Sequence, residues 1–213
     1  MGKKIYFLEK FNFLSKIIDP DVVINHLTNT NAAEIETIFV KLAHRLDRKL
    51  LDRFSNLKYI VSPTTGITHI DTNYTLNRGI KIISLQGEEK FLAAVPSTAE
   101  MTLLFILAIA RNLNAAKAIV SSGEWLRNSE PGSNLRDLRI LIVGFGRVGK
   151  QVDKILTFFG SEIFIFDPEQ KSKNGKGNFL TFNELNKFKF DIVTLHVNFT
   201  LKNAKFFDYS FFS

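Results

Sequence analysis

Three glycines at a fixed spacing are the residues in this sequence whose types and positions most clearly indicate chemistry. Gly144, Gly146 and Gly149 form the pattern Gly-x-Gly-x-x-Gly, directly after an apolar segment and before a helical pattern. In such a turn the first glycine permits the tight bend, the second lets a pyrophosphate approach the backbone, and the third lets the helix pack against the strand. The phosphates then lie on amides at a helix N-terminus. The spacing therefore predicts a dinucleotide-binding turn.

Asp167 stands where the same chemistry needs an acid. It follows a strand predicted over residues 163–166 and lies about twenty residues beyond the glycine turn. A carboxylate at this position accepts hydrogen bonds from the ribose hydroxyls and repels the additional phosphate of NADP. The alternative is that Asp167 and Pro168 only form a turn at a strand end. The order of strand, glycines, helix and acid favours NAD as the cofactor.

The composition is that of a soluble globular protein with one or two domains. The chain has 213 residues, of which 45% are hydrophobic and 23% charged. It contains no cysteine, which excludes disulfides and thiolate chemistry, and its four histidines lack metal-ligand spacing. We therefore expect no metal site.

Charge and hydropathy bear on partners and location. The net charge of +7 comes from lysines and arginines scattered among acids, which favours a solvated surface and a small anionic substrate over nucleic acid. The longest apolar run, residues 103–110, is shorter than the roughly twenty residues that span a bilayer. Charged residues near the N-terminus argue against a signal peptide. We expect a cytoplasmic protein that contacts neither membrane nor nucleic acid.

The elements around the glycine turn alternate between strand and helix patterns, which predicts parallel sheets. The nucleotide-binding part is expected to contain only about three strands, and a polar loop is predicted over residues 169–177. Strands are predicted over residues 4–8, 21–24, 36–40, 57–61, 80–83, 139–143, 163–166 and 191–197, and a short helix over residues 48–54.

One long helix is predicted from Ser97 to about residue 119, with Ser97 or Thr98 as its cap and Glu100 in its first turn. Its apolar residues surround most of the circumference, so we expect burial against two domains or a partner subunit. The predicted domains are residues 1–97 for substrate, 98–134 as a linking helix and loop, and 135–213 for the nucleotide.

Further segments stand in a fixed order from residue 36 onward. They are residues 57–60, 65–67, 70–71, 79–80, 97–100, Gly123 with Trp125, 135–149, 166–168 and 191–197. In this order the segments resemble the D-isomer-specific 2-hydroxyacid dehydrogenase family, which includes the D-3-phosphoglycerate dehydrogenases. An unrelated nucleotide-binding fold would not reproduce that order.

The resemblance implies a flavodoxin-like N-terminal domain plus a Rossmann-type parallel-sheet NAD-binding domain. A hydride would pass between NAD and a 2-hydroxy or 2-keto acid. The backbone amides of Thr64, Thr65 and Gly66 would bind the substrate carboxylate, with Thr65 also near the nicotinamide. The helix over residues 98–119 would lie at the interface of a homodimer. By position, the cofactor-binding residues would be Thr65, Gly144, Gly146, Arg147, Val148, Gly149, Asp167, His196 and Thr200.

The sequence also departs from the family pattern. The family's substrate-binding arginine, its acid partner and its catalytic histidine come later than residue 213, so the resemblance implies a C-terminally truncated chain. Its NAD-binding domain would be incomplete, no catalytic residue would lie within it, and its activity would be impaired or absent. His196 matches a cofactor-side block and is not expected to replace the missing acid. Thr64 stands where the family often has glycine, and Asn198 replaces a usual proline.

A second hypothesis is a non-catalytic module that binds NAD or dimerises through the long helix. Such a module needs a finished, polar C-terminus. The aromatic run over residues 206–212 argues against it, because exposed aromatics at a free end are typical of an interrupted structure.

Overall fold

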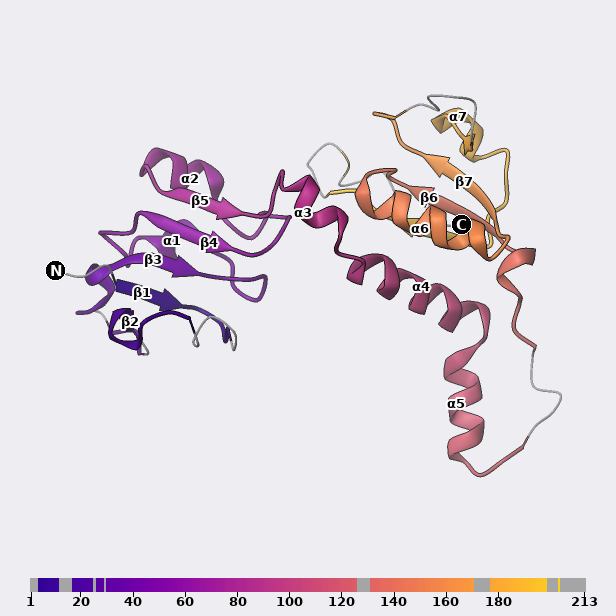
Figure 1. Ribbon diagram of the computed structural model, residues 1–213, viewed down its shortest axis with the longest axis horizontal. Coiled ribbons are helices and arrows are strands. Elements are labelled where there is room, and N and C mark those ends of the chain that lie inside the picture. The colour runs from indigo at the N-terminus through magenta and orange to yellow at the C-terminus, as the bar shows by residue number, and fades with distance from the viewer. Residues whose placement is uncertain are drawn as a thin grey trace. The chain divides into compact units, whose positions relative to one another are not determined.

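The computed structural model describes residues 4–11, 17–24, 26–28, 30–125, 131–170, 177–198 and 203. The chain divides into two compact units, Met1–Leu92 and Ala93–Ser213 (Figure 1). Thr200 and the aromatic run over residues 206–212 lie outside the described residues.

The first unit contains a five-stranded parallel sheet in the order β2-β1-β3-β4-β5 (Figure 1). This is the order of flavodoxin-like sheets. Its core is apolar, with Ile38 on β3 and Ile60 on β4 paired in register and fully buried. The bounds of its elements are β1 Lys4–Phe7, β2 Val23–Ile24, β3 Ile35–Phe39, α1 Arg48–Leu51, β4 Tyr59–Ser62, α2 Thr72–Asn77 and β5 Lys81–Ser84.

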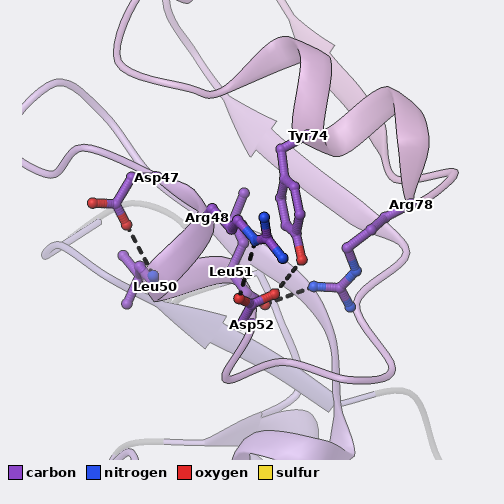
Figure 2. Close-up of polar contacts among 7 residues, drawn as sticks. All are labelled: Asp47, Arg48, Leu50, Leu51, Asp52, Tyr74 and Arg78. Carbon is purple, nitrogen blue, oxygen red and sulfur yellow. Dashed lines mark hydrogen bonds and ion pairs between the residues drawn. The ribbon is translucent and has the colours of Figure 1, made fainter.

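Helix α1 is shorter than the helix predicted over residues 48–54. Asp47 caps its start by accepting a hydrogen bond from the Leu50 amide at 2.9 Å. Its end is fixed by Arg78, whose guanidinium donates to the carbonyl oxygens of Leu51 (Figure 2) and Phe54, each at 2.7 Å. A long-range contact from the end of α2 therefore satisfies the carbonyls that a continuing helix would have used.

The second unit contains a four-stranded parallel sheet in the order β8-β7-β6-β9. Numbered within the unit this is 3-2-1-4, the strand order of a Rossmann fold. Two-residue β8 was not predicted, so the expected count of about three strands was too low. The bounds are α4 Ser97–Ala110, α5 Leu113–Ser121, β6 Arg139–Val143, α6 Arg147–Phe158, β7 Glu162–Phe166, β8 Asn178–Phe179, α7 Phe182–Leu185 and β9 Ile192–Leu195.

Strand β6 is buried on both faces. Ile140 and Ile142 pack with residues of α4 and α6, whereas Leu141 and Val143 pack with Leu185 of α7. Such two-sided burial explains why β6 reads as a continuous apolar run instead of an alternating one. Strand β6 lies between β7 and β9, so its C-terminal end is near the centre of the sheet.

The single long helix predicted from Ser97 is two helices. Asn112, with φ of 49°, separates α4 from α5 in the left-handed conformation. Pro96 occupies the N-cap position, so neither Ser97 nor Thr98 caps the helix as predicted. Glu100 does lie in the first turn.

The exposure of α4 also differs from the prediction. Only Ala99, Ile106 and Ala110 are buried, whereas Leu104 and Phe105 are 52% and 60% exposed. One face of α4 packs on the core of the second unit, to which α4 belongs, and the opposite face is exposed. The predicted burial against two surfaces is therefore absent from this single chain.

By length and composition, the stretch Glu89–Ala110 could cross a membrane. The apolar sequence that is continuous with α4 is therefore longer than the run of residues 103–110 noted from the sequence. The stretch is not one regular helix, because α3 (Glu89–Ala93) ends before Pro96 and α4 begins after it. The buried face of α4 contacts Ile140, Val152 and other residues of the second core.

Candidate functional site

The glycine turn joins β6 to α6 at the C-terminal edge of the second sheet. Gly144 has φ of +88°, a conformation that side-chain-bearing residues rarely adopt. A Cβ there would lie 2.7 Å from the His196 carbonyl oxygen. The Gly144 amide also donates to the Phe166 carbonyl at 2.8 Å. The first glycine therefore lets the turn sit between the ends of β7 and β9.

Gly149 and Gly146 are needed for different reasons. A Cβ on Gly149 would lie 2.1 Å from the Gly144 carbonyl oxygen, so this glycine lets α6 pack against the turn. Gly146 has no atom within 4 Å of its ideal Cβ and an ordinary φ of −71°. Neither packing nor the backbone requires glycine at position 146. Glycine at this position is typical of the motif, whose second glycine lets a pyrophosphate approach the backbone.

Helix α6 begins directly beyond that glycine, with Gly146 as its N-cap and no side-chain cap. The amides of a first helical turn lack intrahelical acceptors and attract anions. Val148 packs its side chain into the second core. Only its backbone amide is therefore available to a ligand. Arg147 donates from Nη1 to the Val95 carbonyl at 3.1 Å.

Asp167 lies at the end of β7 and touches the glycine turn directly. Its Oδ2 accepts a hydrogen bond from the Phe145 amide at 2.7 Å. Its Oδ1 accepts from the amides of Glu169 and Gln170 at 2.9 and 3.2 Å. The predicted ribose-binding acid thus also ties the turn to the loop after β7, a role that sequence reasoning missed.

His196 follows β9, and its amide donates to the Val143 carbonyl at 2.7 Å. Its Nε2 lies 3.0 Å from the Thr194 hydroxyl, and burial lowers the pKa of its imidazole. Strands β6 and β9 are neighbours at the point where the order of the sheet reverses direction, the usual crevice for a dinucleotide. The turn, Asp167 and His196 therefore gather at one edge, whereas the predicted contact Thr200 lies outside the described residues.

The predicted substrate loop follows β4 in the first unit. Thr65 and Gly66 are exposed, and their backbone amides make no hydrogen bond within the described part of the chain. The Thr64 hydroxyl donates to the Gly66 carbonyl at 2.8 Å. Two adjacent free amides can bind a carboxylate. Over the described ranges, no group of three or more histidine, aspartate or glutamate residues could hold a metal ion.

Residues 103–213 match the D-isomer specific 2-hydroxyacid dehydrogenase NAD binding domain. The chain belongs to this family. The match confirms the prediction drawn from the order of sequence segments, and NAD is the cofactor of the matched domain. The parallel strand orders of the two sheets agree with the predicted α/β class.

Two curated relatives of this chain differ in their named activities. It is 28% identical over 167 residues to a hydroxypyruvate reductase of Thermotoga maritima, covering 78% of this chain and 53% of the relative. It is 31% identical over 199 residues to a D-3-phosphoglycerate dehydrogenase of Methanocaldococcus jannaschii, covering 92% of this chain and 34% of the relative. The chain therefore spans about half or less of the length of these relatives.

A solved structure supports the fold of this chain. The NAD-dependent formate dehydrogenase from Staphylococcus aureus in complex with NAD superposes with a TM-score of 0.81 at 19% identity. The superposition covers 99% of this chain and 69% of that protein. At this identity the likeness concerns the fold alone.

Proposed function

We propose that the chain binds NAD at the glycine turn and takes part in hydride transfer between NAD and a small 2-hydroxy or 2-keto acid. Gly146 carries the proposal, because no atom of the described residues lies within 4 Å of a Cβ there and its φ is ordinary. NAD, when bound, supplies or accepts the hydride. The chain's own residues hold its phosphates and ribose and orient the acid.

In this proposal each cofactor contact has a distinct physical basis. The backbone at the first turn of α6, from Arg147 to Gly149, binds the pyrophosphate, as helix N-termini bind anions. Asp167 binds the adenosine ribose and disfavours the phosphate of NADP. His196, uncharged because burial lowers its pKa, borders the adenosine half together with Thr200.

The first unit is proposed to bind the substrate. Its flavodoxin-like sheet presents the amides of Thr65 and Gly66 at the carboxyl end of β4, where ligands of parallel sheets bind. The chemical class that fits is a short carboxylic acid with an oxygen on C2. We assign no proton donor within the described residues.

Calorimetry on the 213-residue chain tests the cofactor site. We expect NAD to bind more tightly than NADP, and Gly146→Ala to lower NAD affinity at least about tenfold, because a methyl group fills the pyrophosphate space. Its melting temperature should stay unchanged, because that methyl group meets no protein atom. Equal NAD affinity in both proteins would contradict the proposed site.

Turnover is tested separately, with NADH and glyoxylate or hydroxypyruvate followed by the loss of nicotinamide absorbance. Oxidation of NADH that depends on the keto acid and is lost in Gly146→Ala supports hydride transfer. NAD binding without turnover would instead favour the non-catalytic NAD-binding module.

We further propose a homodimer through α4 and its neighbours. Met101, Phe105 and Ile109 repeat every four residues along α4 and are each at least half exposed, and Phe158 of α6 is 87% exposed. A soluble chain rarely leaves so much contiguous apolar surface uncovered. Where α4 begins, a cavity of about 400 Å³ is lined by Pro96 and Ala99 and, from α6, by Gln151, Lys154, Ile155 and Phe158. A second copy covers the face symmetrically, which agrees with the interface implied by the family resemblance.

The same packing bears on location. Because the buried face of α4 belongs to the second core, we propose that α4 is a core and interface helix of a cytoplasmic protein rather than a membrane span. High-speed centrifugation of a detergent-free lysate tests this proposal. We expect to recover the 213-residue chain in the supernatant.

A further inference from the structure

A chain of side-chain hydrogen bonds lies beneath the predicted substrate loop. Ser62, the last residue of β4, is 1% exposed. Its hydroxyl oxygen lies 2.8 Å from the Thr64 hydroxyl and 3.4 Å from Nε2 of His69. Thr64 in turn contacts the Gly66 carbonyl oxygen at 2.8 Å. Three hydrogen bonds thus link four residues of this segment, His69, Ser62, Thr64 and Gly66.

The direction of these bonds follows from the acceptor at one end. A carbonyl oxygen can only accept, so the Thr64 hydroxyl spends its single proton on Gly66. Ser62 must then donate its own proton to Thr64, which leaves the Ser62 oxygen able only to accept from His69. His69 therefore carries a proton on Nε2, and the bonds run in one direction from His69 to Gly66.

The other ring nitrogen of His69 agrees with this assignment. Nδ1 is buried and has no hydrogen-bond partner among the described residues. A proton there would be a buried donor on a charged ring with no acceptor. Burial lowers the pKa of His69, outweighing the opposing attraction of the Glu9 carboxylate, so the ring is neutral with its proton on Nε2.

We infer that His69 and Ser62 are positioning residues for the substrate carboxylate, acting through the Thr64 hydroxyl on the loop that presents the Thr65 and Gly66 amides. The inference rests on the proposed function of that loop. It also gives a role to Thr64, which stands where the family often has glycine. A glycine has no hydroxyl to accept a hydrogen bond from Ser62. In this chain, side-chain hydrogen bonds through Thr64 therefore hold the loop in place.

The hydrogen-bond direction is tested without any ligand, by NMR of the 213-residue chain with ¹⁵N-labelled histidine. We expect His69 to be neutral with its proton on Nε2 at pH 7. Ser62→Ala removes the only acceptor of that proton within the described residues and should abolish the preference between the two nitrogens, whereas exposed His44 should keep its spectrum. A proton on Nδ1 in the native chain, or a spectrum unchanged by Ser62→Ala, would overturn the inference.

The effect on substrate is tested by kinetics with glyoxylate and NADH. His69→Leu removes the donor and should raise KM for glyoxylate about tenfold, the equivalent of one lost hydrogen bond, with kcat nearly unchanged. His69→Gln retains an N–H donor and should keep KM within about threefold of the native value. Equal KM in His69→Leu and the native chain, or a fall in kcat alone, would contradict a positioning role. If the native chain turns over no keto acid, the proposed function fails, and the NMR result still decides the direction of the bonds.

Discussion

The carboxylate of Asp167 accepts a hydrogen bond from the backbone amide of Phe145 at 2.7 Å. The acid that ends β7 therefore holds the middle of the glycine turn, as well as two amides of the loop that follows it. A residue expected to choose the cofactor also shapes the turn that binds the cofactor's phosphates. Replacing Asp167 should therefore affect both the choice of cofactor and the structure of the turn.

We predict that Asp167→Ala lowers the free energy of unfolding by about 2 kcal/mol, because three amides lose their acceptor. NAD affinity should fall at least about tenfold, and the preference over NADP should narrow. Urea unfolding and calorimetry measure the two effects. The neighbouring exposed acid provides the control, and Glu169→Ala should change neither quantity. NAD binding unaltered by Asp167→Ala would remove the ribose contact from the proposal.

Gly149 and Gly146 allow a matched comparison within one motif. Gly149→Ala should lower the free energy of unfolding by about 3 kcal/mol, because its Cβ would lie 2.1 Å from a backbone oxygen that cannot easily move. Gly146→Ala, with open space around its Cβ, should unfold like the native chain. Thermal and urea unfolding of both variants decide the matter. Equal stability of the two would mean that α6 does not pack as closely to the turn as described.

The exposed face of α4 predicts an oligomer that charge should dissociate. Phe105 and Ile109 are 60% and 63% exposed, and we expect Phe105→Glu combined with Ile109→Glu to convert a dimer to a monomer. Sedimentation equilibrium is the measurement. Leu76→Glu, at a position 78% exposed on α2, is the control and should leave the dimer intact. A native chain that sediments as a monomer at micromolar concentration would contradict the proposed interface.

Two half-buried histidines, His69 and His196, predict how stability depends on pH. In the folded state, burial lowers the pKa of both His69 and His196 below the ordinary value of 6.5. Below about pH 6.5 the unfolded chain therefore binds more protons than the folded chain, and the free energy of unfolding should fall as the pH drops from 7 toward 5. Combining His69→Gln and His196→Gln should flatten this dependence, measured by urea unfolding across that range. Exposed His44→Gln should leave the slope as it is, and a slope unaffected by the double variant would contradict the prediction.

The sequence predicted the parts of the site whose chemistry is local. The run from β6 through the glycine turn to α6 depends on spacing over about a dozen residues, and Gly144 and Gly149 have separate steric reasons. The acid at the end of β7 was predicted for the same reason. Strand alternation was enough to predict two parallel sheets.

The features that the sequence did not reveal depend on contacts between distant residues or on one backbone conformation. Helix α1 ends early because Arg78, far along the chain, donates to its carbonyls. Asparagine is one of the few residues that tolerate the left-handed conformation, but nothing near Asn112 distinguishes a helix break from a continuous helix. The hydrogen bonds from His69 to Ser62 became visible only when β4 and the following loop were placed in space.

The lack of cysteine has a practical consequence for a chain built from two compact units. Any thiol introduced by substitution is unique and can carry a single spectroscopic label. Leu76 in the first unit and Trp125 in the second are 78% and 86% exposed, so cysteines there should react fully without disturbing either core. A pair of labels at these positions measures whether the distance between the two units changes as NAD and then a keto acid are added.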